Sequence, residues 1–240
     1  MAITIEELES PHECADSFEV VVHNRAVSTL VTSCADAVDW WISAHLLSAR
    51  DCPRMVGFDI KWRPSFARGV RHPVATLHLC IGRYCLVYQI GRARYLPASL
   101  YKALRNPRFV FSGVRIASDA AKLSEDYGLE IEMAVDLAKL AARETNRREL
   151  RRAGLATLVR ELKGRDLKIP QGITLSKWDA RWLSPRQVKY ACADAYYSFR
   201  LGHLLLFNEI YLMWLMKGFG YFLGPDDEAL YLEEMLEDLR

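Results

Sequence analysis

The chain has 240 residues, of which 51% are hydrophobic and 26% charged, a composition that is ordinary for a globular protein with one large or two small domains. It contains no internal repeat and no low-complexity segment, which excludes solenoid and compositionally biased architectures. The charge is unevenly distributed: residues 1–50 have two basic and eight acidic residues, residues 51–224 have 29 and 15, and residues 225–240 have one and seven. The basic centre indicates a polyanionic partner such as nucleic acid, although a solubilising arginine-rich surface has the same composition.

The cysteines argue against a disulfide-based fold. None of the six forms a CxxC pair, and they are too sparse for a disulfide framework in a chain of this length. Cys80 and Cys192 lie in apolar runs and are expected to be core thiols. The N-terminal sequence lacks the basic and apolar regions of a signal peptide, so we expect the nucleus or cytoplasm.

The first half of the chain predicts mainly strands. Runs of β-prone residues lie at Phe18–His23, Ala26–Thr32, Met55–Trp62, His72–Ile81 and Tyr84–Ile90, and apolar residues at helical spacing lie at Ala35–Ser48. Asn24-Arg25 and Gly82-Arg83 provide tight connections between neighbouring strands. The last three strands follow one another closely, which predicts an antiparallel meander.

In the second half strand and helix alternate. Helices are expected at Ser99–Leu104, Asp119–Tyr127, Val135–Ala142, Leu155–Leu162 and Pro185–Phe207, with a short buried strand at Phe109–Gly113. Gly128 ends the second of these helices, and Ser118 or Asp119 is a candidate for its N-cap. A meander followed by alternating elements predicts the α/β class, with a mixed sheet flanked by helices.

The C-terminal part raises a membrane question. Residues 204–223 are strongly apolar, but Asn208, Glu209 and Lys217 interrupt the run, so we expect no membrane span. Asp226–Leu239 has an apolar stripe at helical spacing and is predicted to be a helix. This helix either docks on the domain or binds a protein partner or a second copy of the chain.

Three carboxylates stand out by their placement. Asp59 lies in an apolar strand, where burial is costly unless the charge is paired, so it is either a solvated residue at the strand end or a metal ligand. Asp119 follows the strand Phe109–Gly113, and Asp194 shares a helix face with Tyr190, four residues earlier. Converging carboxylates suit a two-metal cleavage of phosphodiesters with Mg²⁺ or Mn²⁺, and a nearby phenol suits the orientation of water.

Several ordered motifs surround these residues. They are Val56-Gly-Phe-Asp-Ile-Lys-Trp-Arg-Pro64, Ala75-Thr-Leu-His-Leu79, Phe111-Ser-Gly-Val-Arg-Ile116 with Asp119 and Lys122-Leu123, Val135-Asp-Leu137, Trp178-Asp-Ala-Arg181, Leu183-Ser184, Gln187, and Tyr190-Ala-Cys-Ala-Asp-Ala-Tyr196. With them the chain resembles the Werner-syndrome-type 3′–5′ exonucleases, of the DEDDy branch of the ribonuclease-H-like fold, and especially their small plant members.

The resemblance covers roughly residues 18–207 and leaves an acidic lead at 1–17 and a helical extension at 208–240. It implies that Asp59 and Asp194 bridge one divalent ion and that Asp119 holds a second. It also implies that Tyr190 orients the attacking water, and that the substrate is the 3′ end of DNA or RNA.

One departure from the family pattern changes the expected chemistry. The family's first motif is Asp-x-Glu, and Lys61 stands at the glutamate position. Residues two apart on a strand point to the same face, so the ammonium is expected beside Asp59, where a protonated lysine cannot ligate a metal. Arg115 adds a second cation, because it replaces a glycine of the family. We therefore expect one or two ions if the site works, possibly none, and hydrolysis that is impaired or lost.

The alternative is a catalytically inactive pseudo-exonuclease that acts as a protein-interaction or scaffold module through residues 208–240. The candidate nucleic-acid-binding residues near the motifs are Trp62, Arg63, Arg115, Trp178 and Arg181, although large aromatic side chains such as Trp62 and Trp178 more often belong to the core. A basic segment between Arg143 and Lys168 is either a phosphate track or a solvated helix face, because Glu144, Glu149 and Glu161 are interleaved with it.

Overall fold

A computed structural model describes residues 3–47, 54–65, 69–167 and 172–216, with side chains as far as Leu206. The chain divides into two compact units, residues 1–207 and 208–240. The predicted tail helix Asp226–Leu239 lies outside the described residues. Within the described part of the chain, no helix is both long and apolar enough to span a membrane.

The larger unit is built on one mixed sheet. Its eight strands are β1 (Thr4–Leu8), β2 (Ala15–Val22), β3 (Arg25–Thr32), β4 (Arg54–Trp62), β5 (Val74–Ile81), β6 (Tyr84–Tyr88), β7 (Phe109–Gly113) and β8 (Ala134–Asp136), in the order β1-β2-β3-β6-β5-β4-β7-β8. Strands β4, β5 and β6 pair antiparallel, which confirms the predicted meander. β3 pairs parallel with β6, and β7 pairs parallel with both β4 and β8.

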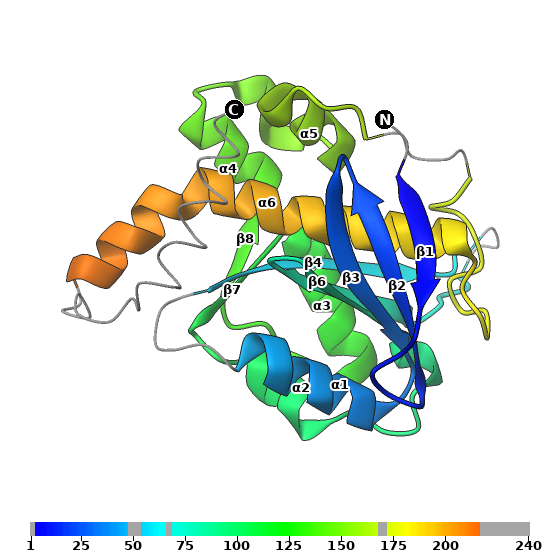
Figure 1. Cartoon of the computed structure of the whole chain (residues 1–240). Helices are drawn as coiled ribbons and strands as arrows, with labels where there is room; N and C mark the ends of the chain where they lie inside the picture. Colours follow the sequence, from blue (N-terminus) through cyan, green and yellow to red (C-terminus); the bar gives the residue numbers. More distant parts are fainter. Residues whose placement is uncertain (1–2, 48–53, 66–68, 168–171, 217–240) are drawn as a thin grey trace. The chain divides into compact units, whose positions relative to one another are not determined.

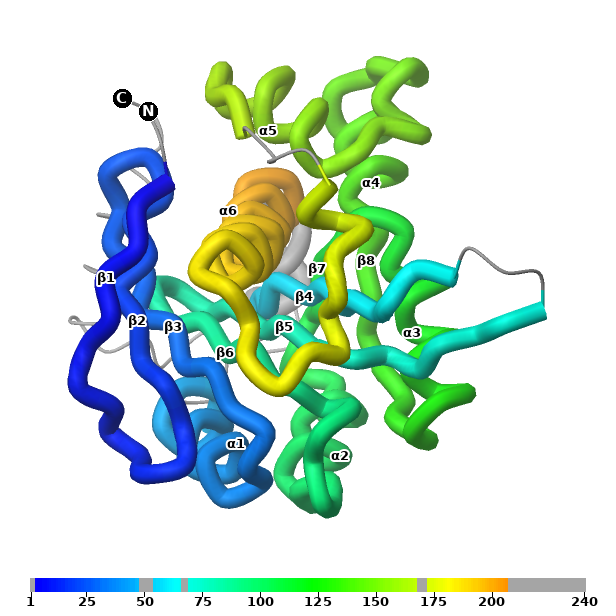
Figure 2. Tube along the Cα trace, turned by 90° about the vertical axis from the view of Figure 1, so that its right-hand side faces the viewer, coloured from blue at the N-terminus to red at the C-terminus, as the bar shows by residue number. Residues whose placement is uncertain are grey.

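Helices cover both faces of the sheet (Figures 1 and 2). One face carries α1 (Ala35–Trp41) with a π-helical turn (Ile42–Leu46), α2 (Ala98–Leu104) and α3 (Ile116–Tyr127); the other carries α4 (Leu137–Glu144), α5 (Leu155–Lys163) and the first part of α6 (Pro185–Met216). Short 3₁₀ helices lie at Ile90–Arg92 and Arg148–Arg152.

Side chains along β4 point alternately to the two helical layers that cover the sheet. Val56, Phe58 and Ile60 point into the hydrophobic core formed with α1, α2 and α3. Gly57 points the other way, towards α6, and a Cβ placed on it would lie 2.5 Å from the backbone nitrogen of Phe199. Because glycine allows the helix backbone to approach the strand directly, the odd-numbered positions of β4 face α6 at close range.

Helix α3 begins earlier than predicted. It starts at Ile116, and Arg115 occupies the N-cap position in the left-handed conformation with φ of 61°. The backbone N–H of Arg115 donates to the carboxylate of Asp136 at 3.0 Å, which holds this turn. Ser118 and Asp119 therefore lie in the first turn, and the prediction that one of them caps the helix was wrong.

The start of the next helix was also predicted wrongly. Val135 belongs to strand β8, and α4 begins at Leu137. Asp136 separates the two elements, because its side chain accepts hydrogen bonds from the backbone N–H groups of Ala138 and Lys139 at 3.0 and 3.1 Å. Hydrophobic periodicity alone does not reveal a strand of this length.

Strand β1 was not predicted at all. It lies within the acidic stretch 1–17 that was expected to lead into the domain, and it pairs antiparallel with β2 at one edge of the sheet. Most of its side chains are exposed, so the sequence shows no clear apolar alternation there.

A histidine contact predicts how stability depends on pH. The Tyr197 hydroxyl on α6 donates to Nδ1 of His23, in the β2–β3 turn, at 2.5 Å. Burial, and then the charge of Arg165, lower the pKa of His23, so the folded chain resists protonation. The unfolded chain takes up a proton near pH 6.5, so the free energy of unfolding falls as the pH drops below about 6.5.

In urea unfolding at about pH 7.5 and about pH 5.5, His23→Asn should lose less stability on acidification than the parent. An equal loss in both proteins would show that His23 does not contribute.

Candidate active site

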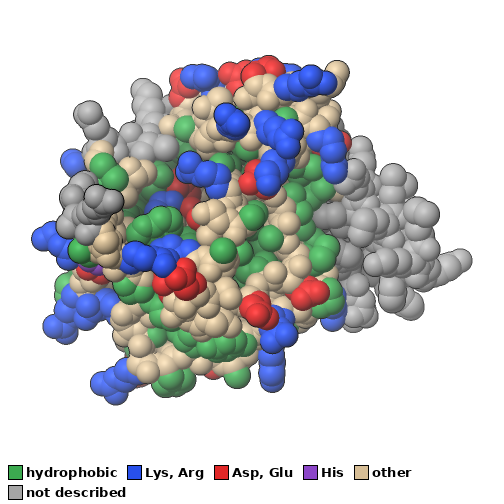
Figure 3. All heavy atoms as spheres, turned by 180° about the vertical axis from the view of Figure 1, so that it is seen from behind, with side chains coloured by type: hydrophobic (Ala, Val, Ile, Leu, Met, Phe, Trp, Pro, Cys, Tyr) green, Lys and Arg blue, Asp and Glu red, His purple; other side chains and the backbone are tan. Residues whose placement is uncertain are grey.

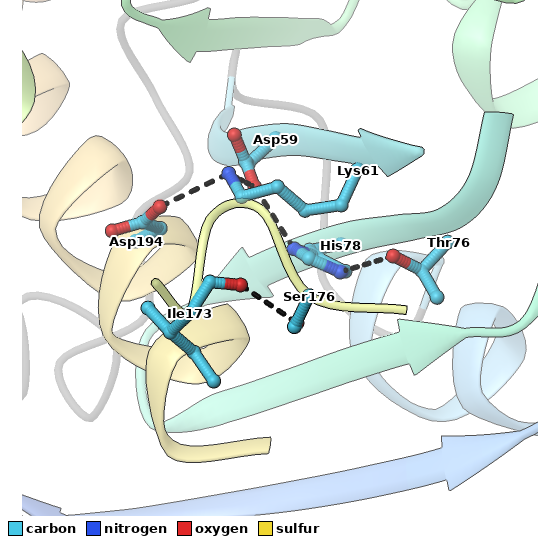
Figure 4. Close-up of polar contacts among 7 residues, drawn as sticks. All are labelled: Asp59, Lys61, Thr76, His78, Ile173, Ser176 and Asp194. Carbon is cyan, nitrogen blue, oxygen red and sulfur yellow. Dashed lines mark hydrogen bonds and ion pairs between the residues drawn. The ribbon is translucent and has the colours of Figure 1, made fainter. Parts of the chain in front are cut away.

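Three elements bring polar side chains together on the α6 face of the sheet (Figure 4). Strand β4 contributes Asp59 and Lys61, and β5 contributes Thr76 and His78, which are their direct partners in the antiparallel register. Helix α6 contributes Asp194 from the opposite side. The odd-numbered side of β4 therefore carries charge at the place where α6 packs against it.

The ammonium of Lys61 joins the two aspartates. Its Nζ lies 2.5 Å from Oδ2 of Asp59 and 3.1 Å from Oδ2 of Asp194, as the dashed lines in Figure 4 show. The same Nζ lies 5.0 Å from the ring centroid of Tyr190, which precedes Asp194 by one turn on α6. Only 14% of the Lys61 side chain is exposed, so this cation is held inside the site and does not extend into solvent.

His78 supports the same carboxylate from the neighbouring strand. Its ring is fully buried, with Nδ1 at 3.0 Å from Oδ2 of Asp59 and Nε2 at 2.8 Å from Oγ1 of Thr76. Burial lowers the pKa of His78, so the imidazole is neutral near pH 7, with Nδ1–H donating to Asp59 and the Thr76 hydroxyl donating to Nε2. The sequence analysis assigned no role to His78, although the alternation of Thr76 and His78 with apolar residues in β5 was a visible signal.

The pKa values follow from this pairing. Burial alone would raise the pKa of Asp59, but the Lys61 ammonium and the His78 hydrogen bond outweigh it and lower the pKa to about 2. Burial raises the pKa of Asp194 to about 6 despite Lys61, and burial and then Asp194 raise the pKa of Tyr190. Burial would lower the pKa of Lys61, but the two carboxylates raise it above its usual value, so the lysine is charged near neutral pH.

Asp119 completes the group of predicted aspartates. It lies in the first turn of α3 and is half-buried. Burial, and then the charge of Asp59, raise its pKa to about 7. The contacts of Lys61 join Asp59, Asp194 and Tyr190, and Asp119 is linked to them through the charge of Asp59.

Trp178 lies in the interior of the domain. It was a candidate for stacking on bases, but only 1% of it is exposed, and its ring packs 5.7 Å from the ring of His78 and 6.1 Å from that of Tyr190. A ring in this position orders the site and does not offer a face to a base. Trp62, by contrast, is 37% exposed.

The three candidate arginines lie at the surface. The guanidinium of Arg63 pairs with Asp179 at 3.3 Å, and that of Arg181 lies 5.3 Å from the ring of Trp182. Arg115 is exposed at the start of α3. Their charges are therefore accessible to a polyanion.

Two glutamines hold the segment that carries Trp178. Gln187 Nε2 donates to the Ser176 hydroxyl and to the Lys177 carbonyl, each at 3.1 Å, and Gln89 Nε2 donates to the Ala180 carbonyl at 3.0 Å. Figure 4 shows the part of this segment with Ile173 and Ser176 beside the Lys61 network. Sequence reasoning missed Gln89, because its partner is a backbone carbonyl 91 residues away.

The donor set does not fit a divalent ion as it stands. Asp194 Oδ1 is buried and has no hydrogen-bond partner among the described residues, which is a feature expected of a ligand oxygen. The Oδ2 atoms of Asp59 and Asp194, however, already contact an ammonium, and a second cation there would be repelled. The described residues contain no group of three or more His, Cys, Asp or Glu side chains that could hold a metal ion.

Comparison with known families identifies the architecture. The sequence model of the 3′-5′ exonuclease domain matches residues 35–207. The chain belongs to this 3′-5′ exonuclease family. This confirms the resemblance found in the sequence. An Arabidopsis thaliana 3′-5′ exonuclease is 38% identical over 62% of the chain, and the mouse bifunctional 3′-5′ exonuclease/ATP-dependent helicase WRN is 32% identical over 59%.

The exonuclease family also shares the fold. Escherichia coli RNase D superposes with a TM-score of 0.63 at 20% identity, over 88% of this chain and 49% of that one, which confirms the predicted ribonuclease-H-like α/β class. The chain spans 52% of the length of the Arabidopsis exonuclease and 10% of the mouse protein. Membership therefore concerns this domain, and the activities of those longer proteins are not transferred with it.

Proposed function

We propose that the protein binds the 3′ ends of nucleic acid and that Lys61 impairs or abolishes metal-dependent hydrolysis at its exonuclease site. The observation that carries the proposal is the position of the Lys61 ammonium between Asp59 and Asp194. A buried cation at this point neutralises the charge that would otherwise attract Mg²⁺ or Mn²⁺.

The surface near α4 and α5 supports binding of a polyanion. Figure 3 shows Lys and Arg side chains over much of the upper part of this face, with some acidic side chains between them. Arg147 is paired with Glu149 and Glu161, each at 2.9 Å, so part of the basic segment is neutralised. Arg148, Arg151 and Arg152 are exposed and form no ion pair with any described residue, which leaves their charges available to phosphates.

The site residues act in this proposal as a fixed electrostatic unit. Lys61 pairs with Asp59 within β4 and joins β4 to α6 through Asp194, and neutral His78 keeps Asp59 oriented through Nδ1. Tyr190 is protonated at neutral pH, and burial and then the charge of Asp194 raise its pKa further, so its phenol is a hydrogen-bond donor. Asp119 is only partly ionised near pH 7, which further reduces the negative charge of the site.

A scaffold function without nucleic-acid binding is the second candidate. It is favoured by the same ammonium and by the separate compact unit at 208–240. The two candidates differ in whether oligonucleotides bind at all.

The test uses 5′-labelled DNA and RNA with free 3′ ends and the full chain. We expect an electrophoretic shift that weakens as salt is raised, that is unchanged by EDTA, and that is accompanied by little or no shortening with Mn²⁺ present. Rapid shortening by the parent chain would contradict the impaired site. Absence of any shift at low salt would favour the scaffold function.

A further inference from the structure

A second candidate site lies beside the exonuclease site. A pocket of about 250 Å³ is lined by Trp62, Arg63, Ser65, Val70, Arg71, His72 and Lys122. Trp62 directly follows Lys61 on β4, and Lys122 lies one turn after Asp119 on α3. The pairing of β4 with β5 is irregular between Lys61 and Trp62, a feature that often re-aims a side chain next to a functional site.

The cations of this pocket are held in place by carboxylates that do not line it. Arg71 makes two hydrogen bonds to Glu125, at 2.5 and 2.6 Å. Lys122 Nζ lies 3.0 Å from the carboxylate of Asp126 and donates to the His72 carbonyl at 2.8 Å. Arginine and lysine side chains fixed in this way lose less conformational freedom when an anion binds.

An aromatic ring lies among these cations. Trp62 is 37% exposed, and Lys122 Nζ lies 5.3 Å from its ring centroid. Indole rings bind nucleobases by stacking, and guanidinium groups bind phosphate. No acidic residue appears among the described residues that line the pocket, although Arg63, Arg71 and Lys122 each pair with a carboxylate outside it. The chemistry therefore suits a flat group that carries a negative charge.

We propose that this pocket binds one nucleotide of a single strand, with the base on Trp62 and a phosphate near Arg63 and Arg71. The inference rests on the proposed function, since it specifies where nucleic acid is held. In the neighbouring exonuclease site the ammonium of Lys61 is already paired with Asp59 and Asp194, whereas the residues that line the pocket include Arg63, Arg71 and Lys122 and no carboxylate among the described residues. The pocket is smaller than the 300–1,000 Å³ common for drug-sized ligands, so its size is closer to that of one nucleotide than to that of a longer segment.

A structural role predicts different results. The contacts of Trp62 and Arg71 also join the β4–β5 connection to α3, so loss of either side chain alters stability whatever binds there. Binding must therefore be measured on variants that stay folded, with stability measured in parallel.

The first experiment measures fluorescence anisotropy of labelled single-stranded DNA and RNA with the full chain. Trp62→Ala should weaken binding about five- to 100-fold, and Trp62→Phe, which keeps a stacking face, should retain most of it. Trp40→Ala is the matched control, because Trp40 is 39% exposed but lies on α1, and its variant should bind like the parent. The DNA and RNA arms show which polymer supplies the nucleotide.

The second experiment exchanges the charges of one ion pair. Arg71→Glu combined with Glu125→Arg keeps the pair but places a carboxylate in the pocket. If the Arg71–Glu125 pair has only a structural role, the double variant should have the melting temperature and the nucleic-acid affinity of the parent. If the pocket binds a nucleotide, the double variant should keep the melting temperature of the parent but bind oligonucleotides at least about tenfold more weakly. Its affinity should also depend less on the salt concentration.

The outcomes separate this inference from the proposed function. If folded Trp62→Ala and the double variant both bind oligonucleotides like the parent, the pocket does not bind the nucleotide, but the proposed nucleic-acid binding by the protein still stands. A parent chain that binds neither polymer at low salt overturns both. Weaker oligonucleotide binding by the pocket variants, with parent-like binding by Trp40→Ala, supports the inference.

Discussion

Lys61→Glu is expected to bind Mn²⁺ and to shorten 5′-labelled substrates from the 3′ end at least about a hundredfold faster than the parent chain. The substitution removes the ammonium that contacts Asp59 and Asp194 and adds a carboxylate at the same position. The local charge becomes more negative by two, which converts a self-neutralised group into one that attracts a divalent ion. Calorimetry measures Mn²⁺ binding independently of activity, and a nuclease assay measures the rate of shortening.

Lys61→Gln is the matched control for this gain. It removes the positive charge without supplying a carboxylate, so it should bind Mn²⁺ more weakly than Lys61→Glu and stay far less active. If Lys61→Glu bound Mn²⁺ no better than the parent, the electrostatic role assigned to Lys61 would be wrong. If it bound Mn²⁺ but stayed inactive, a second defect would have to lie elsewhere, and Arg115 is the first place to look.

Gly57→Ala is expected to lower the free energy of unfolding by about 3 kcal/mol, near the upper end of the usual cost of overpacking. The added Cβ would overlap the carbonyl of Ala195 and lie 2.5 Å from the backbone nitrogen of Phe199. Backbone atoms cannot move aside by changing rotamer, so α6 has to shift away from β4. Urea unfolding measures this cost.

The same shift should disturb the candidate site. Asp194 precedes Ala195 on α6, so displacement of the helix lengthens the 3.1 Å contact between Lys61 and Asp194. Gly154→Ala is the control, because nothing lies within 4 Å of a Cβ there and its φ is −78°, so it should cost less than about 1 kcal/mol. Equal stability of the two variants would contradict the close packing of α6 on β4.

Local contacts explain where sequence reasoning failed in the fold. Gly128 marks the end of α3 in the sequence as it does in the structure. The start of α3 was misplaced because Arg115 adopts a left-handed conformation supported by Asp136, 21 residues away. Strand β1 was missed because an exposed edge strand carries little apolar alternation.

The sequence by itself determined the family and the α/β class, and it singled out Asp59, Asp119, Asp194 and Tyr190 as candidate site residues. It also showed the charge reversal at Lys61 and placed it beside Asp59, because residues two apart on one strand share a face. Only the tertiary structure decided that this ammonium contacts Asp194, 133 residues away, that His78 supports Asp59, and that Trp178 is buried. It likewise decided that Trp62 and Arg71 share a pocket with Lys122. The physical reason is that residues far apart in the sequence meet only when strands pair and helices pack on the sheet. The contact of Gly57 with the α6 backbone, for example, sets how closely α6 approaches β4.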